Sequence, residues 1–242
     1  MIRRYTENNK SSSSKVASFS EHFVPCSAAV PLPVTPPAVK RRQLQAQHLG
    51  LAAVDAGYCC HELTQLHLGV EWRMGQLVVE GARENSTGLL LFELVEKPLS
   101  LHRQRMLLDT TKVPVATIRM STFRRRKVTY SLYSRIELSK RLIKFTISRN
   151  KLEMIFTDIM TGKTCRLGSS GDQGDIEIWL QRGLSAEIVK QPIAHMYLAP
   201  SGTPLGYSID IAEGVDAVMA LLVCIALHDC EPIYRWRATS FA

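Results

Sequence analysis

The 242-residue sequence lacks the short motifs that mark most enzymes and nucleotide-binding proteins. It contains no G-x-S-x-G nucleophile elbow, no G-x-x-x-x-G-K-[ST] phosphate loop, no H-E-x-x-H metal site and no dinucleotide fingerprint. A single carboxylate such as Asp109 or Asp216 has no catalytic partner pattern around it. We therefore expect a protein that is not an enzyme and that has no cofactor.

The sequence also has no apolar run long enough to cross a bilayer. The longest, residues 217–227, contains eleven residues without a charge, Pro or Gly. As a helix it would span roughly 16 Å, about half of the ~30 Å hydrocarbon core. The first residues lack the apolar segment of a secretory signal, and a mitochondrial presequence is the weaker alternative. The expected location is the cytoplasm, with at most peripheral attachment to a membrane.

Cysteine is too sparse for a disulfide framework, with six residues and no C-x-x-C pair. Reduced thiols are the simplest interpretation. The groups Cys59, Cys60, His61, His67 and Cys224, His228, Cys230 do not have the spacing of a tetrahedral zinc site. The acidic residues Asp172, Asp175 and Glu177 lack the frame of a calcium loop. We predict no metal site.

Residues 1–50 show no helical or strand periodicity. They contain a Ser run, five Pro residues and a short basic stretch, a composition typical of a disordered tail. The sequence PLPVTPPAVKRR within it suits a Pro-rich ligand for a protein partner. The expected domains are this tail and a folded unit at residues 51–238.

From residue 51 onward, apolar and polar residues alternate in many short segments. Examples are residues 90–95, 128–133 and 142–147, and this period of two indicates half-buried antiparallel strands. The same pattern predicts strands at residues 70–80 and 232–237, and a Gly-rich turn at residues 168–175. Segment 217–227 is apolar on every side, so as a helix it must be enclosed by other protein. Both observations favour a mainly β fold: a closed antiparallel barrel around one apolar C-terminal helix, which we expect to be a monomer.

Four stretches resemble the LURP-one-related proteins of the tubby C-terminal-like superfamily, to which phospholipid scramblases also belong. They are GLLLFELVEK with RMLLDTTKVPVATIRM, then KVTYSLYS, and YSIDIAEGVDAVMALLVCIAL, in which Gly214, Val215 and Asp216 match the start of the family's central helix. The resemblance implies a barrel of about twelve strands around that helix. The sequence departs from the family at Lys112, where members usually have Gly. Asp216 suits the cap of this helix, and Asp109 suits a turn.

Positive charge is concentrated in one part of the chain. Residues 97–151 contain fifteen Lys and Arg against two acidic residues, a net charge of +13. The rest of the chain contains fifteen Lys and Arg against twenty acidic residues, a net charge of −5. Such a surface attracts phosphates, although a charge run often forms only a solvated face. The candidate phosphate- or lipid-binding residues are Arg119, Arg124, Arg125, Arg126, Lys127, Arg135, Lys140, Arg141 and Lys144.

Several functions fit this charge. The leading hypothesis is a binding module for anionic membrane, because the superfamily resemblance implies phosphoinositide or other anionic phospholipid as the ligand. Nucleic acid is less favoured, since Tyr130 belongs to the apolar set and few aromatic residues interleave with the basic ones. The alternatives are a signalling or defence-type scaffold that binds proteins through its tail, and a scramblase-like lipid transporter, for which the apolar segment is short.

Overall fold

The computed structural model describes residues 43–48, 50–73, 76–97, 103–124, 127–134, 140–149, 151–172, 174–183, 189–200 and 205–239. At residues 72, 73, 76–78, 122–124 and 231–239 only the backbone is described. Most of the predicted tail, including the Pro-rich stretch, lies outside these residues, so the division at residue 50 stays a prediction. The backbone N–H of Gln45 donates to Pro192 O, and that of Gln47 donates to Glu213 O. These two residues are therefore attached to the folded unit.

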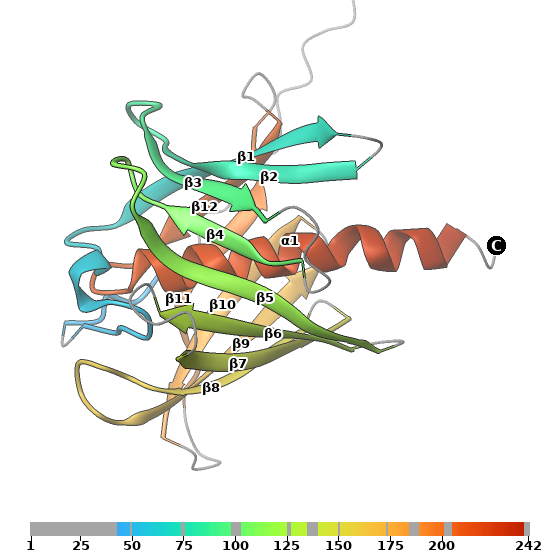
Figure 1. Ribbon diagram of the computed structural model, residues 1–242. Helices are drawn as coiled ribbons and strands as arrows, with labels where there is room; N and C mark the ends of the chain where they lie inside the picture. Colours follow the sequence, from blue (N-terminus) through green and yellow to red (C-terminus); the bar gives the residue numbers. More distant parts are fainter. Residues whose placement is uncertain are drawn as a thin grey trace, which may run out of the picture. The chain divides into compact units, whose positions relative to one another are not determined.

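Twelve antiparallel strands form a closed barrel, as the sequence predicted. They are β1 (Thr64–Arg73), β2 (Gln76–Glu84), β3 (Leu90–Glu96), β4 (Arg105–Leu108), β5 (Pro114–Arg124), β6 (Lys127–Ser134), β7 (Arg141–Ser148), β8 (Lys151–Thr157), β9 (Thr164–Asp172), β10 (Asp175–Arg182), β11 (Gln191–Leu198) and β12 (Gly206–Ile211). Each strand pairs with its neighbours in sequence, and β1 pairs with β12 to close the ring (Figure 1). A short 3-10 helix, Ala56–Tyr58, precedes β1.

The alternation of residues decides which face of each strand is buried. In β7, Ile143, Phe145 and Ile147 are buried, whereas Lys144 between them is exposed. The buried side chains of β6 at the same level include Tyr130, which stacks on Phe145 with 5.4 Å between the ring centroids. A closed sheet has one inner face, so these side chains all meet in one core.

A single helix, α1 (Ala217–Thr239), runs through the ring of strands and continues beyond them (Figure 1). Its residues from Val218 to Leu227 are at most 3% exposed, which confirms the enclosed helix. The predicted strand at residues 232–237 is wrong, because these residues continue α1. Alternation over six residues does not exclude a helix, and the closed barrel leaves no strand edge with which another strand could pair.

Two hairpins also differ from the prediction. Residues 70–80 are not one strand, since β1 ends at Arg73 and β2 begins at Gln76. Most of the predicted turn at residues 168–175 belongs to β9, which extends to Asp172. Gly168 has a packing role, because a Cβ there would collide with the ring of Trp179, whereas Gly174, with a φ of +80°, lies in the turn between β9 and β10. Close approach of a neighbouring side chain therefore explains Gly at position 168 without a turn.

Candidate anion-binding site

The predicted basic residues lie on three adjacent strands. Arg119 is in β5, Lys144 and Arg141 are in β7, Lys127 is the first residue of β6, and Lys140 directly precedes β7. We call these five residues the basic stripe; Arg119 is partly buried and the other four are exposed. The backbone of Arg124 ends β5, whereas Arg125, Arg126 and Arg135 lie outside the described residues.

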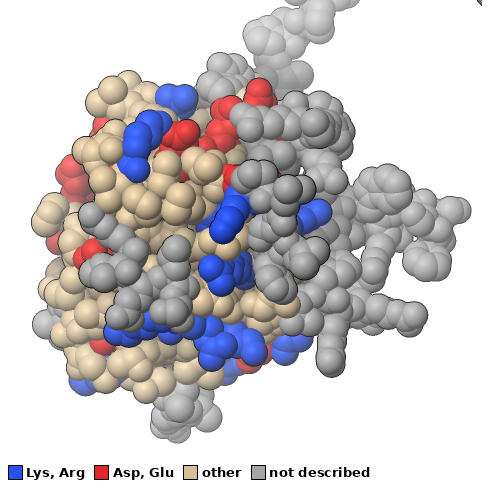
Figure 2. Space-filling model, viewed as in Figure 1, with Lys and Arg blue, Asp and Glu red and all other residues tan. Residues whose placement is uncertain are grey.

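The strand register sets the order along the stripe. Lys127 pairs with Arg124 at one end of the β5–β6 hairpin, and Arg141 pairs with Tyr133 near the other end of β6. Between them, Ser131 pairs with Arg119 on one side and with Lys144 on the other. In Figure 2, Lys and Arg side chains gather in the lower half of the view, where Figure 1 shows β5 to β8.

Four cations outside the stripe form ion pairs with acidic residues. Arg166 forms an ion pair with Glu153 at 2.9 Å, Arg182 with Asp158 at 3.3 Å, Arg105 with Asp229 and Lys112 with Glu93. Within the described part of the chain, none of the five stripe residues has a carboxylate partner within 4 Å. Their charge therefore stays available to an anion from solution.

The side chain of Arg119 is oriented by an aromatic ring. Its Cζ lies 4.5 Å from the centroid of the Tyr133 ring, a cation–π contact. The sequence analysis did not identify Tyr133 as a partner of Arg119. The contact depends on the pairing of β5 with β6, and no local sequence signal gives that register.

The start of α1 shows the geometry of a capped helix. Asp216 Oδ1 accepts a hydrogen bond from Met219 N–H at 3.0 Å, and its Oδ2 accepts from the N–H groups of Ala53, Val54 and Asp55. Burial raises the pKa of Asp216, and these backbone donors offset part of that effect. Gly214 has a φ of +78°, and a Cβ there would collide with the carbonyl oxygen of Gln47. Gly is therefore required at this position.

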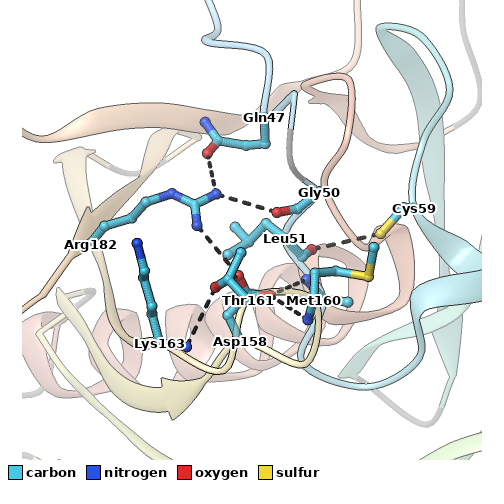
Figure 3. A network of polar contacts seen from close by, with 10 residues as sticks. Gln47, Gly50, Leu51, Cys59, Asp158, Met160, Thr161, Lys163 and Arg182 are labelled. Atoms are coloured by element: carbon cyan, nitrogen blue, oxygen red, sulfur yellow. Dashed lines mark hydrogen bonds and ion pairs between the residues drawn. The ribbon is translucent and has the colours of Figure 1, made fainter.

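Sequence reasoning missed a second buried carboxylate at this end of the barrel. Asp158, fully buried, accepts hydrogen bonds from Ala52 N–H at 3.1 Å and from the Thr161 hydroxyl (Figure 3). Arg182 bridges this carboxylate to Gln47 Oε1 at 2.9 Å and to Gly50 O at 3.3 Å. The network attaches residues 47–52 to the barrel. We assign it a structural role, since the buried carboxylate of Asp158 and both Nη groups of Arg182 have partners from the chain.

An ion pair also lies at the level where α1 leaves the core. Arg105 of β4 is 7% exposed and pairs with Asp229 of α1. Burial lowers the pKa of Arg105 and raises that of Cys230 to about 11. Burial likewise raises the pKa of Cys224 to about 12, so its thiol stays protonated.

The cysteines form no visible site. Cys59, Cys60, Cys165, Cys224 and Cys230 are free, and Cys26 lies outside the described residues. Over the ranges that the structure describes, no group of three or more His, Cys, Asp and Glu is arranged to hold a metal ion. Of the acidic residues considered for calcium, Asp175 instead contacts His195 Nε2 at 2.6 Å.

With the barrel and its helix established, the family can be assigned. The family model described as LURP-one-related matches residues 81–229, more than half of the chain. The chain belongs to the LURP-one-related family. This family is not known as an enzyme family, and membership points to a non-catalytic domain. The matched range includes the whole basic stripe and most of α1.

One solved structure shares the LURP-one-related fold seen here. It is the X-ray structure of an Arabidopsis thaliana protein, with a TM-score of 0.50 and 22% identity; the match covers 75% of this chain and 99% of that chain. At this identity the likeness concerns the fold alone. Among curated proteins, none matches the chain. Within the residues described, α1 is not apolar enough over its length to cross a bilayer, and no other helix is a candidate.

Proposed function

We propose that this LURP-one-related barrel is a non-enzymatic binding module that docks on anionic membrane through the basic stripe. The observation that carries the proposal is the set of five cations on β5, β6 and β7 without carboxylate partners in the described structure. Arg105, Lys112, Arg166 and Arg182, by contrast, are each paired with an acidic residue. A local excess of unpaired positive charge attracts the anionic lipids of a membrane surface.

The arrangement suits a surface rather than a small molecule. The stripe follows β6 from Lys127, its first residue, to the neighbourhood of Tyr133, close to its last. At about 3.3 Å per residue, six residues span roughly 20 Å, a length that covers several lipid headgroups. The attachment is therefore the sum of several weak electrostatic contacts, each of about 1 kcal/mol.

Liposome co-sedimentation tests this proposal with two charge-matched variants. Lys140→Gln with Lys144→Gln removes two charges from the stripe. Lys163→Gln with Lys190→Gln removes two exposed charges outside it, beside β9 and β11. On vesicles of phosphatidylcholine with phosphatidylserine, the stripe variant should bind up to roughly 30-fold more weakly than wild type at low salt.

The control variant should keep most of the wild-type affinity, because it has the same net charge but an intact stripe. The difference between the variants should shrink as salt rises, since screening shortens the reach of surface charge. Wild type that does not prefer anionic over neutral vesicles would overturn the proposal. Equal loss in both variants would show that net charge alone, and not the stripe, attracts the membrane.

A further inference from the structure

The middle of the basic stripe contains a row of three side chains across three strands. Arg119, Ser131 and Lys144 are successive register partners on β5, β6 and β7. Directly paired residues in an antiparallel sheet have Cβ atoms about 5 Å apart. The row faces outward, because Leu132 and Phe145, which follow Ser131 and Lys144, are buried in the core. Two positive groups therefore stand on either side of one hydroxyl.

A β-bulge brings a second hydroxyl to this row. Met120 pairs with Tyr130 and Thr122 pairs with Thr129, which leaves Ser121 without a register partner. Ser121 Oγ lies 2.9 Å from Ser131 Oγ. Bulges commonly re-aim a side chain in this way.

Burial decides which serine donates in this pair. Ser131 is 2% exposed, and its one hydrogen bond to a described residue is the contact with Ser121. Either hydroxyl could donate in this pair; because a buried hydroxyl group that does not donate loses free energy, we assign Ser131 as the donor and Ser121 as the acceptor. Ser121 is exposed and keeps its own O–H for a ligand.

The side chain of Arg119 is also positioned to bind an anion. Its Cζ lies 4.5 Å from the centroid of the Tyr133 ring, a contact that restricts the side chain, and a planar guanidinium can bind two oxygens together. Its Nε is buried and has no hydrogen-bond partner among the described residues. An oriented guanidinium loses little conformational freedom when it binds a ligand.

From these contacts we infer that Arg119, Ser121 and Lys144 form a cradle for a single phosphomonoester group, with Ser131 as a positioning residue. The inference rests on the proposed function, since it names the ligand group that the stripe selects on the membrane. A phosphomonoester carries a charge of about −1.5 to −2 at pH 7, which matches the two cations, and it offers three acceptor oxygens. The phosphodiester of an ordinary anionic phospholipid offers less charge and fewer free oxygens. The cradle therefore prefers a monoester, such as the phosphate on an inositol ring.

The test compares two vesicles of equal surface charge, one with phosphatidylserine and one with phosphatidylinositol 4-phosphate, each in phosphatidylcholine. Wild type should bind the second at least about tenfold more tightly, the effect expected for one additional hydrogen bond to a charged group. Arg119→Lys, which keeps the charge but loses the planar fork, and Ser121→Ala, which keeps all charges, should each remove most of this preference. Neither should change binding to phosphatidylserine by more than about twofold. Lys140→Gln, a stripe residue outside the cradle, should weaken both interactions by the same factor.

Calorimetric titration with soluble inositol 1,4,5-trisphosphate tests whether the phosphate group comes from a membrane lipid or from a free headgroup. Binding that is weakened by Arg119→Lys supports the cradle in either case, and tighter binding to the vesicle assigns the lipid. Equal affinity of wild type for the two vesicles would overturn the cradle and leave the membrane proposal in place. If wild type bound neither vesicle, the membrane proposal would fail; the cradle would then stand only if the soluble headgroup bound and needed Arg119. Unchanged thermal unfolding of each variant shows that the site, and not the fold, was altered.

Discussion

Asp216 Oδ2 accepts a hydrogen bond from the backbone N–H of Val54 at 2.9 Å, although 162 residues separate the two. The same carboxyl group caps α1 through Met219 N–H. One side chain thus fixes both the start of the central helix and the segment that precedes β1. Since Asp216 is fully buried, these hydrogen bonds are shielded from water.

The titration of Asp216 should be visible in the stability of the protein. Burial raises its pKa in the folded state above the ordinary value of 3.8. The folded protein then holds this proton more tightly than the unfolded chain, so the contribution of Asp216 falls as pH rises from about 4 through the folded pKa. Asp216→Asn does not titrate, so the stability that it loses relative to wild type should shrink as pH rises. Chemical denaturation of both proteins between pH 4 and pH 7 measures this difference. A loss that grows with pH would show that the four N–H donors outweigh burial.

The centre of α1 should not tolerate a charge. Leu222 is 0% exposed inside the barrel, and Leu222→Asp would leave an unpaired carboxylate in an apolar core. This costs several kcal/mol against a total stability of about 5 to 15 kcal/mol, so the variant should not accumulate as a folded protein. Leu222→Met, which conserves volume, should cost less than about 1.5 kcal/mol. Soluble expression and thermal unfolding are the measurements, and an unchanged melting temperature of the Asp variant would refute the enclosed helix.

Lys112 should be a site where Gly stabilises the barrel. Its φ is +63°, a left-handed conformation that costs a residue with a side chain about 1 kcal/mol and Gly almost nothing. Lys112 also pairs with Glu93, but its side chain is 63% exposed and such a pair contributes little. Lys112→Gly should therefore raise the free energy of unfolding by about 0.5 to 1 kcal/mol. Lys112→Ala is the control, because it loses the ion pair with Glu93 but still has a Cβ that disfavours the left-handed conformation. If Gly were no more stable than Ala, backbone strain would not explain the position.

Truncation should separate the tail from the barrel end. Removal of residues 1–42 should leave cooperative unfolding, because among the described residues the backbone hydrogen bonds that attach the N-terminal segment begin at Gln45. Removal of residues 1–50 also deletes the Gln47 and Gly50 acceptors of Arg182, next to buried Asp158. Loss of acceptors for a partly buried guanidinium should lower stability by about 1 to 3 kcal/mol. Urea denaturation of the two truncated proteins gives the comparison; equal stability would show that these contacts are dispensable.

The sequence predicted the fold correctly where apolar and polar residues alternate along a short segment. Alternation identified β6 and β7 because each strand turns one face to the core, as Tyr130, Phe145 and Ile147 show. The same rule was wrong at residues 232–237. A six-residue alternation fits either a strand or the end of a helix, and the choice depends on whether a free strand edge exists.

The candidate site could be predicted only as a list of basic residues. Their grouping on neighbouring strands followed from their closeness in sequence. The pairing of Arg119 with Ser131, and of Ser131 with Lys144, needs the register, in which a shift of one residue would turn each side chain to the opposite face. Bulges such as the one at Ser121 shift the register without a sequence signal strong enough to locate them.

Composition and period thus determined the barrel, the enclosed helix and the local charge, since apolar burial acts on each segment by itself. The contacts between distant segments were decided by the tertiary structure. Arg105 is paired with Asp229, and Arg182 with Asp158, because barrel closure brings them together. The stripe cations have no such partner within the described residues, and their grouping on neighbouring strands gives them a candidate function. The sequence alone does not show whether a charged side chain is neutralised, because this depends on which residues the closed sheet places beside it.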